Sequence, residues 1–123
     1  MRVEGKSIIV TGAGGGIGEG IARRLASEGA AVIVNDINAA LGEKVTADIN
    51  AAGGRARFVA GDVTKSADWQ ALVAAAQAFG GQLDVIVNNA GWTHRNRPML
   101  EVSEAEFDKV YDVNMKSIYW SAI

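Results

Sequence analysis

The sequence predicts an α/β fold, in which a parallel sheet is covered by helices on both faces. Short runs of β-branched and other apolar residues alternate with longer stretches whose apolar residues recur at helical spacing. The short runs are apolar at successive positions, which is typical of strands that are buried on both faces. The length of 123 residues suits one domain, and no repeat, linker or low-complexity segment interrupts it.

Four strands are predicted in order, at residues 7–10, 31–35, 56–60 and 83–88. A first helix is predicted after the first glycine cluster, with Gly29 at the C-terminal end of the helix. Two more helices are predicted over residues 39–52 and 66–79. Ser66 is the expected N-cap of the third helix, and Ser103 with Glu106 forms a capping box that opens a last one. Gly20 lies inside the first helix, where only close packing would explain it.

The composition excludes several classes of protein. Twelve Lys and Arg against 14 Asp and Glu give a net charge of −2, so neither nucleic acid nor a membrane surface is expected as the main partner. The absence of cysteine excludes disulfides and thiolate chemistry, and the single histidine, His94, leaves little basis for a metal site. The apolar run at residues 8–10 is too short for a signal peptide or membrane span, so we expect a cytoplasmic protein.

A glycine-rich loop follows the first strand directly and precedes the first helix. The unpaired N–H groups of a helix start, with the positive end of the helix dipole, suit a phosphate. Glycines let the backbone approach a pyrophosphate closely. The spacing is G-x-x-x-G-x-G over Gly12, Gly16 and Gly18, and no Lys-Ser/Thr follows, which excludes a P-loop. The alternative is a flexible glycine-rich turn.

Two acidic residues follow the next two strands. Asp36 can accept both hydroxyl protons of an adenosine ribose, and its charge would repel a 2′-phosphate. Gly15 and Ile37 offer no cation to hold that phosphate, so these residues favour NAD over NADP. Asp62 is placed to meet an adenine amino group. Each acid on its own could simply form a turn.

The residues after the fourth strand separate two kinds of adenosine-binding enzyme. Methyltransferases also place a glycine loop after the first strand and acids after the next two. Here the fourth strand ends in Asn88-Asn-Ala-Gly91, whose two amides can cross-link strands and hydrogen-bond a ligand over the sheet edge. This motif argues against a methyltransferase.

With these motifs the sequence resembles the short-chain dehydrogenase/reductase family. The matches are Thr11-Gly-x-x-x-Gly-x-Gly18, Asp36, Gly61-Asp62-Val63, Asn88-Asn-Ala-Gly91 and Asp112-Val-Asn114-Met-Lys-Ser, in the family's order along the whole chain. The resemblance implies a Rossmann-like, doubly wound parallel sheet of strand order 3-2-1-4 that binds NAD and holds no metal. The expected cofactor-binding residues are Gly12, Gly14, Gly15, Gly16, Ile17, Gly18, Asp36, Ile37, Asp62, Val63, Asn89, Ala90 and Gly91.

The resemblance also implies that Asn114 is the helix asparagine of the family's Asn-Ser-Tyr-Lys catalytic set, where it holds a water on the proton path. The serine and the Tyr-x-x-x-Lys pair do not occur in this chain. Tyr111 and Lys116 cannot replace that pair, because residues five apart point about 140° apart on a helix. We therefore expect the N-terminal half of a longer enzyme, cut before a fifth strand and inactive by itself.

The expected function is oxidoreduction, with hydride transfer between a nicotinamide and an alcohol or ketone. The parent enzyme is expected to be a homo-oligomer, as a dimer or tetramer. A non-catalytic NAD-binding module and another adenosine-cofactor enzyme are the alternatives. The strand order leaves the fourth strand at an edge, so we expect isolated residues 1–123 to dimerise or aggregate.

Overall fold

The computed structural model describes residues 2–90, 103–105 and 108. Its helices are α1 (Gly16–Ser27), α2 (Ala39–Ala51) and α3 (Ser66–Gly80). Its strands are β1 (Ser7–Val10), β2 (Ala31–Asp36), β3 (Arg55–Ala60) and β4 (Val85–Val87). Glu104 and Ala105 are helical, in agreement with the helix start predicted at Ser103. Gly91 and Asn114 lie outside the described residues.

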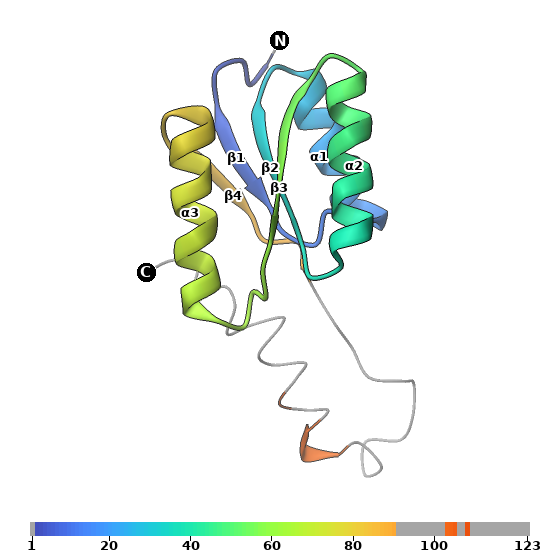
Figure 1. Cartoon of the computed structure of the whole chain (residues 1–123), viewed down its shortest axis with the longest axis vertical. Coiled ribbons are helices and arrows are strands. Elements are labelled where there is room, and N and C mark those ends of the chain that lie inside the picture. Colours follow the sequence, from blue (N-terminus) through green and yellow to red (C-terminus); the bar gives the residue numbers. More distant parts are fainter. Residues whose placement is uncertain (1, 91–102, 106–107, 109–123) are drawn as a thin grey trace.

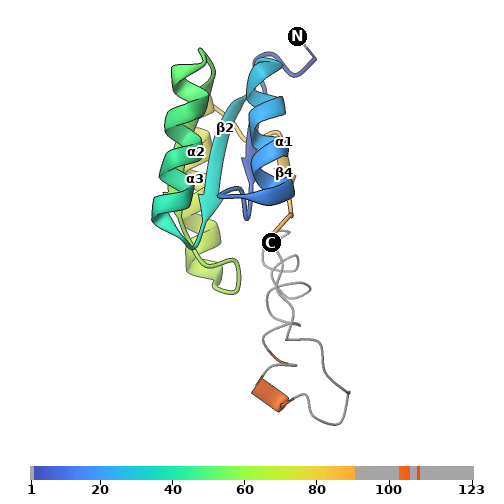
Figure 2. The ribbon, with the colours of Figure 1, turned by 90° about the vertical axis from the view of Figure 1, so that its right-hand side faces the viewer.

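The described strands form one parallel sheet of order β3-β2-β1-β4, as the sequence predicts. Ile9 of β1 stands between Ile33 of β2 and Ile86 of β4. Helices α1 and α2 cover one face and α3 covers the other (Figures 1 and 2). The chain is therefore doubly wound around its two central strands.

The two faces of the sheet carry separate hydrophobic clusters because successive side chains of a strand point to opposite sides. Ile8, Val10 and Val32 pack beneath α1 and α2. Ile9 and Ile33 pack beneath α3, together with its residues Trp69, Leu72 and Ala76. The edge strands are less covered, and Val85 of β4 is 44% exposed. Among the strands, the two central ones thus supply nearly all of the buried residues.

The predicted N-cap of α3 and the predicted length of β4 are wrong, and the other predicted strand and helix ends agree with the structure to within one residue. Ser66 is the first residue of α3, whereas the N-cap is Lys65, which makes no side-chain hydrogen bond. The Lys65 N–H donates to the Asp62 carbonyl and closes a turn. This turn places the N-cap at Lys65, one residue before the predicted position. Strand β4 is shorter than residues 83–88 because the Asn89 N–H turns back to the Val87 carbonyl and to the hydroxyl of Thr11, the residue after β1.

Gly20 also differs from the expectation. Nothing lies within 4 Å of the position that a Cβ would take there, so close packing does not explain it. By contrast, Gly29 has a φ of 98°, and its N–H bonds to the Ala26 carbonyl, as expected of a glycine that ends α1.

The start of β4 is tied to β1 by a carboxylate. Asp84 accepts the Ser7 N–H at 2.8 Å, and its own N–H donates to the Ser7 carbonyl at 2.9 Å. The Ser7 N–H lowers the pKa of Asp84 against an opposing effect of burial, with Gln82 adding a smaller lowering. The charged form of this carboxylate is therefore favoured in the folded state.

This lowered pKa predicts an acid-sensitive contribution to stability. The contribution is complete above the unfolded pKa of about 3.9 and is lost as the pH falls through the lower folded value. Asp84→Asn should therefore show a smaller fall in melting temperature than the wild type between about pH 4 and pH 2. Melts across this range measure it, with Glu43→Gln of α2 as a control for loss of one charge. Equal acid slopes for Asp84→Asn and the wild type would contradict the role of Asp84.

Candidate functional site

The residues predicted to bind a ligand gather at one edge of the sheet. Parallel strands bring their carboxyl ends to the same edge. The glycine loop follows β1, Asp36 ends β2, Asp62 follows β3, and Asn89 with Ala90 follows β4. In Figure 1 this edge lies at the lower end of the sheet.

The buried hydroxyl of Thr11 joins the ends of β1 and β4. It accepts the N–H groups of Asn89 and Ala90, both at 3.0 Å, and it donates to the Val87 carbonyl at 3.3 Å. Thr11 is 1% exposed, and the three bonds are partly buried. One side chain therefore fixes the position of the Asn89–Ala90 segment relative to the glycine loop.

Two motif glycines make room for this segment. A Cβ at Gly12, whose φ is 63°, would lie 2.9 Å from Ala90 Cα. A Cβ at Gly18 would lie 2.3 Å from the Gly12 carbonyl oxygen and 2.4 Å from Asn89 Nδ2. The Asn89 amide donates to that same carbonyl at 3.2 Å. Only glycine fits these two positions, so the loop and the β4 end are packed backbone to backbone.

The start of α1 presents backbone donors at this edge. Gly15 is the N-cap and has no side chain to bond the first N–H groups of the helix. Gly16 has a φ of 57°, which lets the chain turn into the helix. The side chain of Ile17 is 77% exposed beside these donors. The arrangement can receive an anionic group together with an apolar surface.

Asp36 lies at the end of β2 against the glycine loop. One carboxylate oxygen accepts the Gly14 N–H, and the other accepts the Asn38 N–H, both at 2.9 Å. Asn38 caps α2 by accepting the Leu41 N–H at 3.1 Å. Ile37, the next residue along, is 75% exposed. Asp36 is thus a half-buried carboxylate with an apolar neighbour open to solvent.

Asp62 takes part in a turn, the alternative that the sequence left open. Its side chain accepts both the N–H and the hydroxyl of Thr64, at 2.9 and 2.6 Å. Its own N–H donates to Asp68 at 2.8 Å. Val63 is 7% exposed and packs in the cluster beneath α3, so only its backbone faces the edge.

The sequence reasoning missed two buried polar side chains that build this edge. The sequence indicates Thr11 only as part of the glycine motif. It indicates Asn35 only as the end of a strand, but Asn35 is 1% exposed and donates to the Val59 and Gly61 carbonyls at 3.1 and 3.3 Å. A polar residue closing an apolar strand is the signal that indicates such a role, because buried polar groups need partners.

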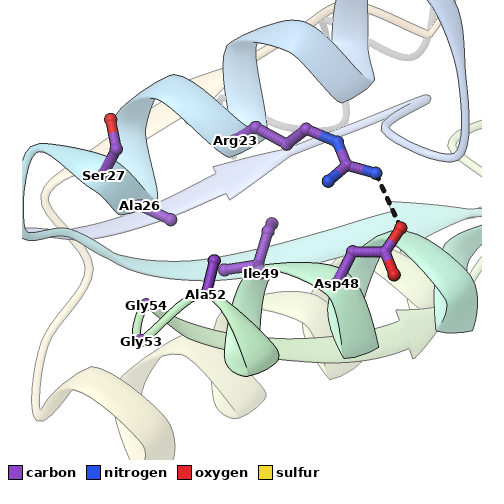
Figure 3. Close-up of a pocket in the computed structure, with 8 residues that line it drawn as sticks. All are labelled: Arg23, Ala26, Ser27, Asp48, Ile49, Ala52, Gly53 and Gly54. Carbon is purple, nitrogen blue, oxygen red and sulfur yellow. Dashed lines mark hydrogen bonds and ion pairs between the residues drawn. The ribbon is translucent and has the colours of Figure 1, made fainter.

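A separate pocket of about 280 Å³ lies between the C-terminal halves of α1 and α2, away from the glycine loop. Ala26, Ile49 and Ala52 supply its apolar wall. Figure 3 shows Arg23 reaching from α1 to Asp48 of α2, and the two bond at 2.9 Å. This ion pair joins the two helices that cover one face of the sheet.

The described residues contain neither a candidate metal-binding group nor a candidate membrane-spanning helix. No group of three or more His, Cys, Asp or Glu side chains in that part of the chain is arranged to hold a metal ion. No described helix combines the length and apolar character that crossing a membrane requires.

The fold and the glycine-lined edge define an α/β protein of the Rossmann nucleotide-binding type. The family model for short chain dehydrogenases matches residues 6–122, and the chain belongs to this family of oxidoreductases. The resemblance that the motifs suggest is therefore confirmed.

Several relatives are dehydrogenases or reductases. The 4-formylbenzenesulfonate dehydrogenase of Comamonas testosteroni is 54% identical over 122 residues, which are 99% of this chain and 48% of that protein. A diacetyl reductase of Staphylococcus epidermidis is 41% identical over 110 residues, or 89% of this chain and 42% of that protein. The chain thus spans about half the length of these relatives.

Solved structures show the same fold. The 3-ketoacyl-(acyl-carrier-protein) reductase of Brucella melitensis, complexed with NADH, has a TM-score of 0.91 and 41% identity, over 98% of this chain and 48% of that one. A metagenomic short-chain oxidoreductase in complex with NADP has a TM-score of 0.90 and 36% identity, over 98% of this chain and 55% of that one.

Proposed function

We propose that this chain binds NAD along the carboxyl edge of its sheet and serves an oxidoreductase that transfers hydride between a nicotinamide and an alcohol or ketone. The observation that carries the proposal is the glycine-lined edge. The positions of Gly12 and Gly18 have no space for a Cβ, and Gly15 leaves the first N–H groups of α1 without a side-chain cap. Such a surface fits a pyrophosphate, which needs close backbone approach and N–H donors.

The other residues of the edge would hold the remaining parts of the dinucleotide. Asp36 would accept the hydroxyl groups of the adenosine ribose, and Ile37 would lie against the adenine. Asp62 would accept the adenine amino group, and Val63 is also proposed to contact the dinucleotide. Asn89 and Ala90, with Gly91, would contact the half that carries the nicotinamide.

A bound nicotinamide dinucleotide supplies the hydride donor or acceptor, which no side chain of the protein provides. The chain itself would bind and orient the dinucleotide. We propose that Asn114 holds a water molecule on the proton path of a longer enzyme, as the asparagine of the family's Asn-Ser-Tyr-Lys set, whose Tyr-x-x-x-Lys pair does not occur in this chain. Relatives named cyclopentanol dehydrogenase and diacetyl reductase support a small alcohol or ketone as substrate. We also propose that the whole protein is cytoplasmic and forms a homo-oligomer.

Titration with cofactors tests the proposal. The chain should bind NAD at least about tenfold more tightly than NADP, a difference of about 1.4 kcal/mol, because Asp36 repels a 2′-phosphate. Asp36→Ala should weaken NAD binding and reduce this preference, whereas Glu43→Gln, which removes an exposed acid of α2, should change neither. Isothermal titration calorimetry measures the affinity of each of the three proteins for NAD and for NADP.

Tighter binding of NADP would contradict the assignment of Asp36. Binding of S-adenosylmethionine in place of either dinucleotide would contradict the proposed cofactor class. Binding of NAD with no dehydrogenase activity in the whole protein would favour a non-catalytic NAD-binding module.

A further inference from the structure

The carboxylate of Asp36 connects two separate segments of the chain before any ligand is bound. Its Oδ2 atom accepts the N–H of Gly14 in the glycine loop, and its Oδ1 atom accepts the N–H of Asn38 at the start of α2, both at 2.9 Å. The preceding pair of residues forms a parallel link, since the Ala13 N–H donates to the Asn35 carbonyl at 2.9 Å. Two consecutive N–H groups of the loop are thus held by two consecutive residues of β2.

The glycine at position 14 is explained by the same contact. A Cβ there would lie 2.7 Å from Asp36 Oδ2 and 3.0 Å from Leu41 Cβ. Gly14 is not one of the three glycines of the G-x-x-x-G-x-G spacing. A Cβ at Gly15, the next residue, would meet nothing within 4 Å. The close approach is therefore specific to the residue that bonds the Asp36 carboxylate.

We propose that Asp36 is a positioning residue for the glycine loop, in addition to the ribose contact that rests on the proposed function. Its acceptor oxygen holds the loop in the shape that places the α1 donors, and its negative charge selects the cofactor. These two properties belong to one side chain but are separable. Removal of the whole carboxylate at position 36 would loosen the loop as well as relax the cofactor preference.

Asparagine at position 36 separates the two properties. Its amide has one acceptor oxygen and no charge. The Gly14 N–H is part-buried in its bond to Asp36, whereas the Asn38 N–H is exposed and can bond to water instead. We expect the amide of Asp36→Asn to turn its oxygen to Gly14, because an unsatisfied buried donor is the more costly one. The variant should keep the loop in place without the charge.

Amide hydrogen exchange of the cofactor-free protein, followed by NMR, tests the positioning role. In Asp36→Ala the Gly14 N–H should exchange about tenfold faster or more than in the wild type, since hydrogen bonds to charged groups are the stronger ones. Asp36→Asn should restore exchange to near the wild-type rate. The Ala13 N–H is the internal reference for an intact fold, because it bonds to a backbone carbonyl. Glu43→Gln of α2 is the control for loss of a carboxylate elsewhere.

Unchanged Gly14 exchange in Asp36→Ala would overturn the proposal, as would equally fast exchange in Asp36→Asn. Gly14→Ala gives an independent check, because it keeps the charge but displaces the carboxylate, and it should weaken NAD binding about as much as Asp36→Ala does. In titrations, Asp36→Asn should bind NADP more tightly than Asp36→Ala does. Failure of the wild type to bind NAD would overturn the proposed function alone, because the exchange measurement contains no cofactor.

Discussion

Gly18→Ala is expected to lower the free energy of unfolding by about 1–3 kcal/mol and to weaken NAD binding by more than about tenfold. The added Cβ would lie 2.3 Å from the Gly12 carbonyl oxygen and 2.4 Å from Asn89 Nδ2. One of these atoms belongs to backbone that cannot move without shifting the loop. The loop and the β4 end must then separate, which removes the surface proposed for the pyrophosphate. Thermal melts and calorimetric titration measure the two effects.

Gly20→Ala is the matched control in the same helix. A Cβ at Gly20 has nothing within 4 Å, so this variant should be more stable than the wild type by about 0.5–1 kcal/mol, the propensity difference between glycine and alanine in a helix. If Gly18→Ala behaved like Gly20→Ala, the close packing of the glycine loop against Asn89 would be refuted.

Leu72→Ala is expected to have the largest effect on stability, about 2–5 kcal/mol. Leu72 is 0% exposed and packs in the cluster between α3 and the sheet, with Ile9, Ile33 and Trp69. Truncation removes apolar contacts and leaves a cavity that the parallel strands cannot close by moving. Chemical denaturation of both proteins gives the difference.

Leu72→Met controls for the volume of this side chain and should cost less than about 1.5 kcal/mol. Leu72 lies in the cluster beneath α3 and is not one of the residues proposed to bind NAD. At temperatures where Leu72→Ala remains folded, its affinity for NAD should equal that of the wild type. A loss of affinity without a loss of stability would show that α3 takes part in cofactor binding.

The strands and the predicted cofactor-binding residues that follow them are indicated by local sequence signals, whereas the strand order is what the family resemblance implies. Buried strands, a glycine loop and an acid after each strand need only a few neighbouring residues to be recognised, and the structure brings them to one edge. The roles of Thr11 and Asn35 could not be found in this way. Their partners, such as Asn89 and Gly61, are distant along the chain, and no periodic pattern links them.

Boundaries were less predictable for the same reason. Ser66 has the side chain of an N-cap, but the turn of Asp62 and Thr64 determines where α3 begins. The reason for a glycine at position 14 could not be predicted locally either, because the atom that leaves no space for a Cβ there belongs to Asp36 at the end of another strand. Local propensity predicts which elements form, whereas contacts between elements set their ends.

The hydroxyl of Thr11 also has a consequence for the order of folding. Its two N–H partners at Asn89 and Ala90 follow it by 78 and 79 residues. At a synthesis rate of about 5–20 residues per second, these partners leave the ribosome roughly 4–16 s after Thr11 does. The pairing of β1 with β2 involves nearer segments and can form in that interval, whereas the long-range closure onto β4 must wait. We therefore expect the carboxyl edge to be assembled last, on a sheet whose other strands are already in place.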